Sequence, residues 1–356
     1  MTQLEDSVLD KKYGLFTGPA VYQDGIAAYD EPIYDPALDS KSYVLDHPNS
    51  HNIKCLSTNA VYYQAYVILG EMARKCEPSM VSTYKTKATT LKQNFRKYLY
   101  NANAGKLNYL IDGTGKAHEY QEALGVAYTI MFGLVSEKEA QKIISNTYQS
   151  ANGIPCVWPC FPRNSVEKPG RHNVMIWPHV NMAYAAACAT VGEKKPFWFE
   201  INQTADMVKY GDARLNPYDD GAEAAKECAK ATNVKPEGNF HEIYTVDGIP
   251  SGGWQCGTQW PPLNHQTWCA TGYLNAFYKS ICGMTPTLHG LSFAPMGMED
   301  GSEVSLKNIT YRKANINITV VGNGKKVKKC TINGKVSKPF IPANASGNYD
   351  VEIQLI

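Results

Sequence analysis

A single carboxylate in an aromatic loop is the part of this sequence that most directly suggests chemistry. Glu242 lies in a Gly-rich stretch together with Tyr244, Trp254, Gln255 and Trp260. Loops carry binding and catalytic groups more often than helices do. Aromatic faces suit the C–H faces of a pyranose ring, and amide and carboxylate groups suit its hydroxyls. The stretch therefore predicts carbohydrate binding, and the alternative is that these aromatics are core residues of a large domain.

A second carboxylate is needed to break a glycosidic bond. One carboxyl group protonates the leaving oxygen, and the other activates water or attacks the sugar directly. The segment GPAVYQDGIAAYDEPIYD, residues 18–35, offers Asp24, Asp30, Glu31 and Asp35. We favour Asp24 as the acid, with Asp30 as the alternative, because small and apolar neighbours raise the pKa of a carboxyl group as a general acid requires.

Structural roles are the alternative for both carboxylates. Asp24 precedes Gly25, so its alternative role is to cap a turn of its own loop. The alternative for Glu242 is a salt bridge to a neighbouring side chain. Tyr22 and Gln23, next to Asp24, are candidate sugar contacts.

Two further clusters contain candidate substrate-binding residues. HEYQEALG places Glu122 at the start of a predicted helix, where the helix dipole favours a carboxylate even without a ligand. A Pro- and Trp-rich loop carries the other candidate sugar contacts, which are Trp158, His172, Asn173 and Trp177. The alternative for His172 is a structural role.

Composition excludes several other classes of function. The net charge is +2 and the sequence has no long basic run, so it gives no sign of the basic surface that nucleic-acid binding needs. No apolar run reaches transmembrane length, and the opening MTQLEDSVLD has acids where a signal peptide needs an apolar core. Cys156, Cys160 and His172 offer only half of a metal site. We therefore expect no cofactor, metal, membrane or nucleic-acid partner, and leave localisation and oligomeric state open.

Helical periodicity dominates the first part of the chain. Apolar residues recur at three- and four-residue steps in most of the predicted helices, and Ser136 with Glu139 forms a capping box. In the first helix the predicted buried stripe is Val61, Ala65, Ile68, Leu69 and Met72. Ser57 or Thr58 is the predicted N-cap of the first helix, and Gly283 ends the last. The predicted helices span residues 57–72, 79–100, 119–132, 136–144, 174–191, 196–209, 222–231 and 266–281.

After residue 286 the pattern changes to short β-branched runs separated by Gly, Asn and Lys turns. We therefore expect a helical domain over residues 1–286 and a small antiparallel, sandwich-like β domain over residues 287–356. The helices follow one another as hairpins, and the candidate site residues lie in every second connection between them. Hairpins that close into a ring bring these connections to one end, so the pattern predicts an (α/α)-toroid. Seven or eight helices are too few for six hairpins, so we expect the (α/α)6-toroid to be incomplete at its N-terminal side.

The sequence resembles six-hairpin glycoside hydrolases, especially the inverting enzymes of glycoside hydrolase family 63 and bacterial relatives. The resemblance covers most of residues 14–295 and rests on GLFTGPAVYQDG, LSTNAVYYQAYVIL, HEYQEALG, GRHNVMIWP, FHEIYTVDG and QTWCATGYL. It implies that Asp24, ahead of Asn59-Ala60, is the general acid and that Glu242, in Glu-Ile-Tyr, is the general base. This sequence has Asp-Gly-Ile-Ala where the family's acid loop has polar and Pro-Arg residues after the Asp.

The resemblance implies an inverting exo-glycosidase that acts on α-linked gluco-, manno- or rhamno-configured oligosaccharides. Two alternatives remain at this stage. One is a phosphorylase or epimerase on the same toroid, and the presence of a base carboxylate speaks against the phosphorylase. The other is a non-catalytic carbohydrate-binding or truncated domain.

Overall fold

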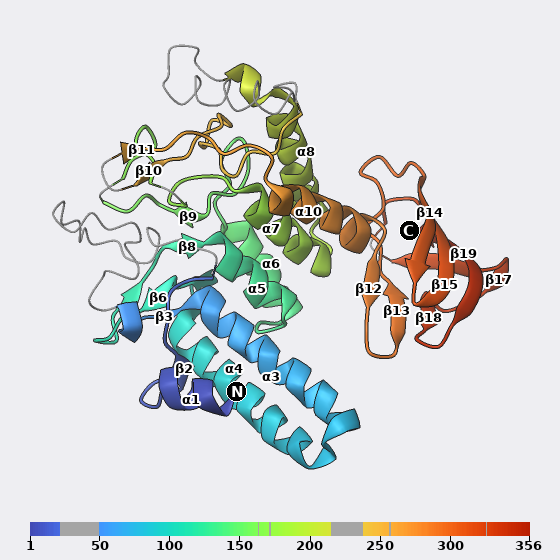
Figure 1. The fold of residues 1–356 in the computed structure, drawn as a ribbon, viewed down its shortest axis with the longest axis horizontal. Coiled ribbons are helices and arrows are strands. Elements are labelled where there is room, and N and C mark those ends of the chain that lie inside the picture. The colour runs from blue at the N-terminus through green and yellow to red at the C-terminus, as the bar shows by residue number, and fades with distance from the viewer. Residues whose placement is uncertain (22–49, 163, 171, 215–237, 256–257, 325) are drawn as a thin grey trace.

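Helices form the first part of the molecule and β sheets form the last part (Figure 1). The computed structural model describes residues 1–21, 50–162, 164–170, 172–214, 238–255, 258–324 and 326–356. Within these ranges, no helix is both long and apolar enough to cross a membrane.

The helices begin near the predicted positions, except where an extended segment leads into one. The α-helices are α1 (Thr2–Val8), α3 (Leu56–Cys76), α4 (Val81–Leu99), α5 (Ala123–Met131), α6 (Glu137–Asn146), α7 (Pro178–Thr190), α8 (Lys194–Tyr210) and α10 (Thr267–Ala276), which continues as a π-helix, η5 (Phe277–Ile281). Short 3-10 turns cover Ser50–Asn52, Pro78–Met80 and Asp212–Arg214. The helix predicted over residues 222–231 lies outside the described residues.

Four helices form an inner row. α3 contacts α5, α5 contacts α7, and α7 contacts α10, while α4 and α8 pack against the outside of α3 and α7 (Figure 1). Each inner helix begins on the side of the short strands and runs toward the C-terminal sheets. Among the described residues, α3 and α10 stand at the two ends of this row, and the complete toroid stays a prediction.

The helices at the two ends of the row each leave an apolar stripe exposed. On α3 the exposed residues are Val61, Ile68 and Met72, so the predicted buried stripe of this helix is wrong at these positions, because no helix among the described residues covers this face. On α10 and η5 the exposed residues are Trp268, Leu274 and Tyr278. α7, which has neighbours on both sides, has no exposed large apolar residue. The stripes therefore mark where the row of helices stops.

The start of α3 differs from the prediction. Cys55 is the N-cap residue, in extended conformation and without a side-chain cap, so neither Ser57 nor Thr58 serves as the cap. The amide of Ser57 instead donates to Glu122 Oε2 at 3.1 Å, and its hydroxyl accepts from the amide of Val21 at 3.0 Å. A carboxylate from a distant loop thus satisfies an amide that a local cap would otherwise satisfy.

Two local predictions are confirmed. The capping box of α6 is present, with Ser136 and Glu139 bonded reciprocally. Gly283 ends the last helical segment with φ +72°, a backbone conformation that favours glycine.

Short strands lie at the end where the inner helices begin. They are β1 (Leu9–Asp10), β2 (Leu15–Phe16), β3 (Lys54–Cys55), β4 (Tyr100–Asn101), β5 (Lys106–Leu107), β6 (Leu110–Ile111), β7 (Ala117–His118), β8 (Gln121–Glu122), β9 (Val157–Trp158), β10 (Trp254–Gln255) and β11 (Thr258–Gln259). Most of them pair only with one neighbour, and β3, β6 and β7 form a three-stranded sheet.

The C-terminal strands form two sheets. One has the order β12 (Met284–Pro286), β13 (Gly290–Phe293) and β18 (Phe340–Pro342). The other has the order β14 (Val304–Tyr311), β15 (Lys313–Val321), β19 (Ser346–Leu355), β16 (Val327–Ile332) and β17 (Lys335–Val336). The expected all-antiparallel arrangement is wrong at one position, because the last strand inserts between β15 and β16 and lies parallel to β15.

Separate apolar clusters fill the two parts. The larger one joins the helices, with Phe95, Leu124 and Phe197 among its fully buried members. The smaller one lies between the sheets, around Ile316 and Ile341, and Phe277 packs against both clusters. The predicted division at residue 286 stays a prediction.

Two glycines in the inner helices should respond oppositely to alanine. A Cβ at Gly125 in α5 meets Glu122 Oε2 at 2.5 Å and Leu56 Cδ2 at 2.7 Å, whereas a Cβ at Gly70 in α3 has only an ordinary contact at 3.6 Å with Tyr84. We expect Gly125→Ala to lower the free energy of unfolding by about 1–3 kcal/mol because the packing is too tight. Gly70→Ala should raise it by about 0.5–1 kcal/mol because alanine favours a helix interior.

Chemical denaturation of the two variants beside the unsubstituted protein gives both values. Equal effects of the same sign would contradict the close packing of α3 against α5.

Candidate active site

Extended segments lead into the inner helices at one end of the molecule. The N-cap residues Cys55, Glu122, Trp177 and Gln266 all have extended backbone angles. Backbone hydrogen bonds join most of these segments side by side: Ala123 N to Cys156 O (2.9 Å), Cys156 N to Met175 O (2.8 Å), Ile176 N to Tyr244 O and Tyr244 N to Ile176 O (both 2.8 Å), and Gln266 N to Phe240 O (2.9 Å). The residues in and beside these segments form the candidate site.

Glu242 lies within this set of segments. Its amide donates to Leu263 O at 2.9 Å, and its carbonyl oxygen is 3.6 Å from the Cys269 thiol at the start of α10. Burial, and to a smaller degree the nearby Glu242 charge, raises the pKa of Cys269 to about 12. Burial and the charges of Cys269 and Glu242 likewise raise the pKa of Cys156. The backbone of Glu242 thus lies against the Cys269 thiol, and the residue is 4% exposed.

Aromatic rings adjoin this region. The His172 and Trp177 rings stack with centroids 4.7 Å apart, and Trp177 meets Trp268 edge-on at 6.3 Å. His172 has φ +56° and Val174 has φ +60°, in the left-handed region. Strained backbone of this kind concentrates at functional sites, and here it turns the loop that precedes α7.

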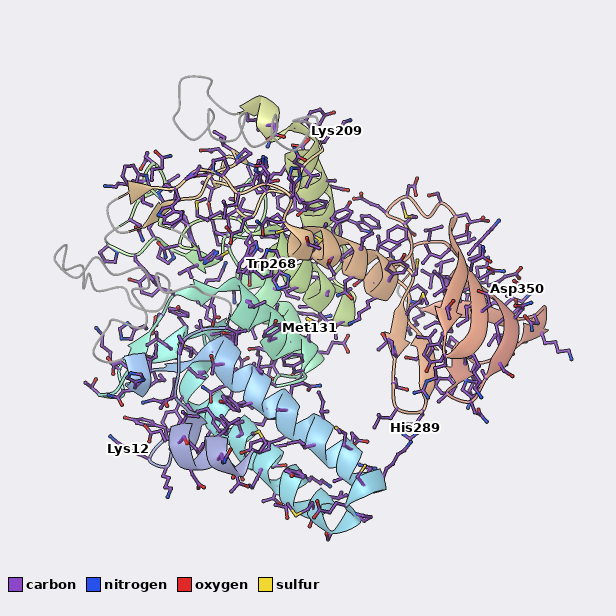
Figure 2. All side chains as sticks on the ribbon, viewed as in Figure 1. Lys12, Met131, Lys209, Trp268, His289 and Asp350 are labelled. Atoms are coloured by element: carbon purple, nitrogen blue, oxygen red, sulfur yellow. The ribbon has the colours of Figure 1, made fainter. Side chains whose placement is uncertain are left out.

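A groove of about 610 Å³ runs between the first turns of α7 and α10. It is lined by His179, His265, Gln266, Trp268, Thr271 and Asn275. Trp268 is 51% exposed at the start of α10 (Figure 2), and its indole N–H donates to Gln266 Oε1 at 2.6 Å. Burial lowers the pKa of His179, which favours a neutral imidazole at pH 7. The groove thus combines an aromatic surface with amide, hydroxyl and imidazole groups, which suits a saccharide.

Two of the candidate sugar contacts are engaged in structural hydrogen bonds. The buried Tyr244 hydroxyl donates to Asn239 O at 3.2 Å and accepts from His241 N at 3.0 Å, and burial raises its pKa. The buried Asn173 Oδ1 accepts from Phe161 N at 3.1 Å. Both residues hold the shape of the loops, and a direct contact with sugar stays a prediction.

Glu122 is fully buried between α3 and α5. Its Oε2 accepts from Ser57 N, and its Oε1 has no hydrogen-bond partner among the described residues. Burial raises its pKa to about 7, against the smaller opposing effect of the hydrogen bonds from Ser57. This carboxyl group is therefore largely neutral at slightly acidic pH and capable of donating a hydrogen bond.

The predicted tryptophans lie in different places. Trp158 stacks on Tyr148 and lines another pocket, and Trp254 lies under the Lys168 ammonium at 4.3 Å. Trp260 is 45% exposed. Gln255 pairs with Thr258 through the backbone of β10 and β11. Among the described aromatics that were predicted, Trp177 is the one that contacts Trp268 of the groove.

The predicted acid lies outside the described residues, as do Tyr22 and Gln23 beside it. Asp24 as the partner of Glu242 therefore stays a prediction. Among the described residues, no group of three or more His, Cys, Asp or Glu side chains is arranged to hold a metal ion.

Sequence reasoning missed the groove residues His179, His265, Gln266 and Trp268. The signal was present, because Trp268 and Gln266 lie in the QTWCATGYL motif and His179 follows Trp177 by two residues. Their proximity depends on contact between α7 and α10, which no local pattern reveals.

Comparison with known proteins gives distant structural similarity only. No protein-family model matches the sequence, and no curated protein matches it. The fold is similar to that of neutral trehalase Nth1 from Saccharomyces cerevisiae, with a TM-score of 0.49 and 11% identity over 76% of this chain and 53% of that chain. It is also similar to an uncharacterized conserved protein from Thermus thermophilus, with a TM-score of 0.42 and 15% identity over 65% of this chain and 48% of that one. The chain thus spans about half the length of either protein.

Because Glu122 holds a proton in the folded protein, the protein should become less stable as the pH rises and this proton is lost. Its pKa is about 7 in the folded protein against 4.5 ordinarily, so between these values the folded state binds more protons than the unfolded state. The free energy of unfolding should therefore fall from about pH 4.5 to pH 7, by up to about 3 kcal/mol for this group. Glu122→Gln should remove this pH-dependent part of the free energy of unfolding, which urea denaturation across the pH range measures.

Glu200 is the matched control, because burial also raises its pKa to about 7. Its carboxylate accepts hydrogen bonds from Gln149, Ile154 and Asn181. Glu200→Gln should therefore remove a similar pH-dependent contribution and, unlike Glu122→Gln, also lower stability at every pH, since the amide nitrogen that replaces one carboxylate oxygen cannot accept a hydrogen bond. A Glu122→Gln variant that keeps the full pH dependence would contradict the assigned burial of the carboxyl group.

Proposed function

We propose that this protein is an inverting exo-glycosidase that hydrolyses α-linked oligosaccharides of gluco, manno or rhamno configuration. The observation that carries the proposal is that the backbone carbonyl of Glu242 contacts Cys269 on α10, the helix whose exposed Trp268 lines the groove. A carboxylate on a segment held against such an aromatic, amide-lined groove supplies the residue types that a glycosidase site needs.

Glu242 is the proposed general base. In this role its carboxylate takes a proton from the water molecule that attacks the sugar. Trp268 offers an exposed ring for the sugar face, and Gln266, Thr271 and Asn275 offer polar groups for hydroxyls.

Asp24 is the proposed general acid, on the strength of the sequence resemblance. An inverting mechanism needs its carboxyl group roughly 6.5–9.5 Å from that of Glu242, which leaves room for the attacking water. A separation of about 5 Å would favour a retaining mechanism instead.

A non-catalytic carbohydrate-binding protein is the second candidate. The 4% exposure of Glu242 favours it, because a nearly buried carboxylate also fits a structural role. Release of reducing ends from an oligosaccharide distinguishes the two candidates, since a binding protein retains the sugar without cleaving it. Comparing turnover with and without phosphate separates hydrolysis from phosphorolysis.

Replacing the base should abolish hydrolysis and spare binding. We expect Glu242→Gln to lower kcat on the preferred aryl α-glycoside by roughly 10²–10⁴-fold, because the amide cannot take a proton from water. Calorimetry should give a sugar Kd within about threefold of the unsubstituted protein. Glu303→Gln, an exposed carboxylate on the C-terminal part, is the control and should change neither value. Unchanged turnover in Glu242→Gln would refute the assigned role.

Removing the exposed ring of the groove should weaken substrate binding. Trp268→Ala should raise KM or Kd roughly tenfold, and Trp268→Phe should raise it less, because an aromatic face remains. Tyr210→Ala, which removes another exposed ring at the end of α8, is the control. Equal Kd values for all three variants would exclude the groove as the sugar site.

A further inference from the structure

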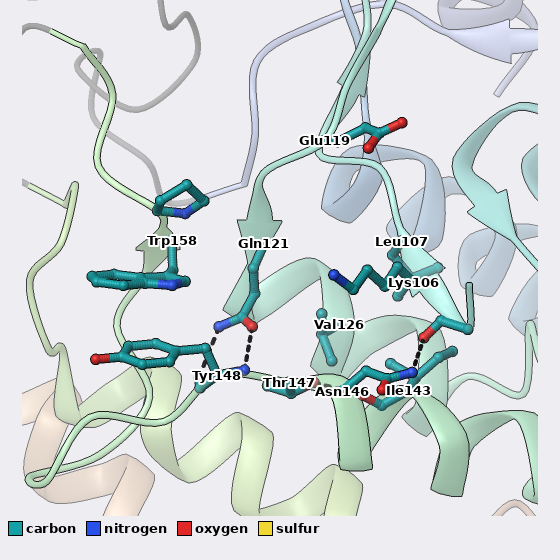
Figure 3. Close-up of a pocket in the computed structure, with 12 residues that line it drawn as sticks. Lys106, Leu107, Glu119, Gln121, Val126, Ile143, Asn146, Thr147, Tyr148 and Trp158 are labelled. Carbon is teal, nitrogen blue, oxygen red and sulfur yellow. Dashed lines mark hydrogen bonds between the residues drawn. The ribbon is translucent and has the colours of Figure 1, made fainter.

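A second pocket lies beside the β8–β9 pair, whose residues Gln121 and Trp158 contribute to its lining. It encloses about 250 Å³ and is the small cavity drawn in Figure 3. β5, β8, α5, α6, and the segments after α6 and around β9 contribute its lining. Its position outside the groove of Trp268 makes it a separate candidate for ligand binding.

One wall of this pocket is held in place. The Tyr148 and Trp158 rings stack with centroids 4.0 Å apart and an interplanar angle of 12°. The Gln121 side chain bonds the Tyr148 backbone twice, donating to its carbonyl at 3.1 Å and accepting from its amide at 2.7 Å (Figure 3). The wall is thus fixed before a ligand arrives, which lowers the entropy cost of binding.

The floor of the pocket is apolar, and its rim carries both donors and acceptors. Leu107, Val126 and Ile143 form the floor. The Lys106 ammonium extends into the space between Gln121 and Val126 (Figure 3). The exposed Glu119 carboxylate lies at the rim. No hydrogen bond joins either charge to another side chain within the described part of the chain.

The chemistry of this lining selects among ligand classes. A site for an anion would present hydrogen-bond donors and positive charge only. This pocket has both the Lys106 ammonium and the Glu119 carboxylate in its lining, so its net charge is zero and an anion is not favoured. A site for a lipid or a drug-sized apolar ligand would be larger and without charges at its rim. An uncharged polyhydroxylated ring, with apolar faces and hydroxyls that both donate and accept, fits the remaining description.

We propose that this pocket binds one uncharged hexose unit of the oligosaccharide, at a distance from the unit that Glu242 acts on. The proposal rests on the proposed function for the identity of the ligand. Trp158, which lines the pocket, is half-buried and lies on β9, and the buried Cys156 precedes it by two residues on the same segment. The pocket shares no lining residue with the groove of Trp268, so the two sites would hold different sugar units.

The test compares long and short ligands in variants of the rim. Lys106→Ala, Glu119→Ala and the double variant remove the exposed charges without removing a side-chain hydrogen bond of the described fold. We expect the Kd of maltotetraose or α-mannotetraose, whichever binds, to rise roughly five- to tenfold in the double variant, as for one or two lost hydrogen bonds. Calorimetry on the Glu242→Gln background measures binding without cleavage.

The short ligand is the internal control. Turnover of the p-nitrophenyl α-glycoside of the same sugar should stay unchanged, because a single glycosyl unit at Glu242 does not extend into the pocket. Lys138→Ala with Glu137→Ala, an exposed pair on α6 outside the pocket, is the matched control and should leave both ligands unaffected.

The outcomes separate this pocket from the proposed function. Tetrasaccharide binding and turnover that are identical in the double variant and the unsubstituted protein overturn the pocket and leave the glycosidase intact. Binding that depends on Lys106 and Glu119 in a protein that cleaves no glycoside supports the pocket and overturns the glycosidase. A protein that neither binds nor cleaves any of these sugars overturns both.

Discussion

Backbone hydrogen bonds between the extended segments that precede the inner helices are the constraint on which the site depends. The pair formed by Ile176 and Tyr244, with two bonds of 2.8 Å, ties the start of α7 to the loop of Glu242. Cys156 bonds both this segment and the start of α5. Because these bonds bring the starts of neighbouring helices together, side chains that are far apart in sequence gather at one end of the row. The C-terminal sheets pack at the opposite end (Figure 1).

The same arrangement gives three carboxyl groups different environments. Glu122 and Glu200 are fully buried, and burial raises the pKa of each to about 7. Both carboxyl groups tie segments of the helical part together, since Glu122 accepts from the first turn of α3 and Glu200 accepts from Asn181 of α7. Glu242 differs in its segment, which hydrogen-bonds Leu263 and contacts Cys269 on α10, the helix that lines the aromatic groove. This connection to the groove helix, rather than burial alone, distinguishes the proposed catalytic carboxylate from the two structural ones.

Local sequence signals predicted the elements better than the site. The capping box of Ser136, the stop at Gly283 and the apolar periodicity of α4 depend on neighbours in the chain, so the sequence revealed them. In α3 the periodicity predicted the helix but not its buried face, because Val61, Ile68 and Met72 are exposed. The starts of α5 and α7 came later than predicted, because Glu122 and Ile176 form extended pairs with distant segments. For the same reason the sequence did not separate Trp158, which stacks on Tyr148, from Trp177, which meets Trp268. Which aromatic faces which pocket depends on tertiary pairing.

The configuration of the first sugar released tests the central claim most directly. Proton NMR can follow the anomeric signals during hydrolysis of the preferred α-glycoside, before the product equilibrates in solution. Water activated by Glu242 attacks the face opposite the leaving oxygen, so the account predicts the β-anomer first. Release of the α-anomer first, or binding of the sugar with no release at all, would contradict the assignment of Glu242 as the base of an inverting hydrolase.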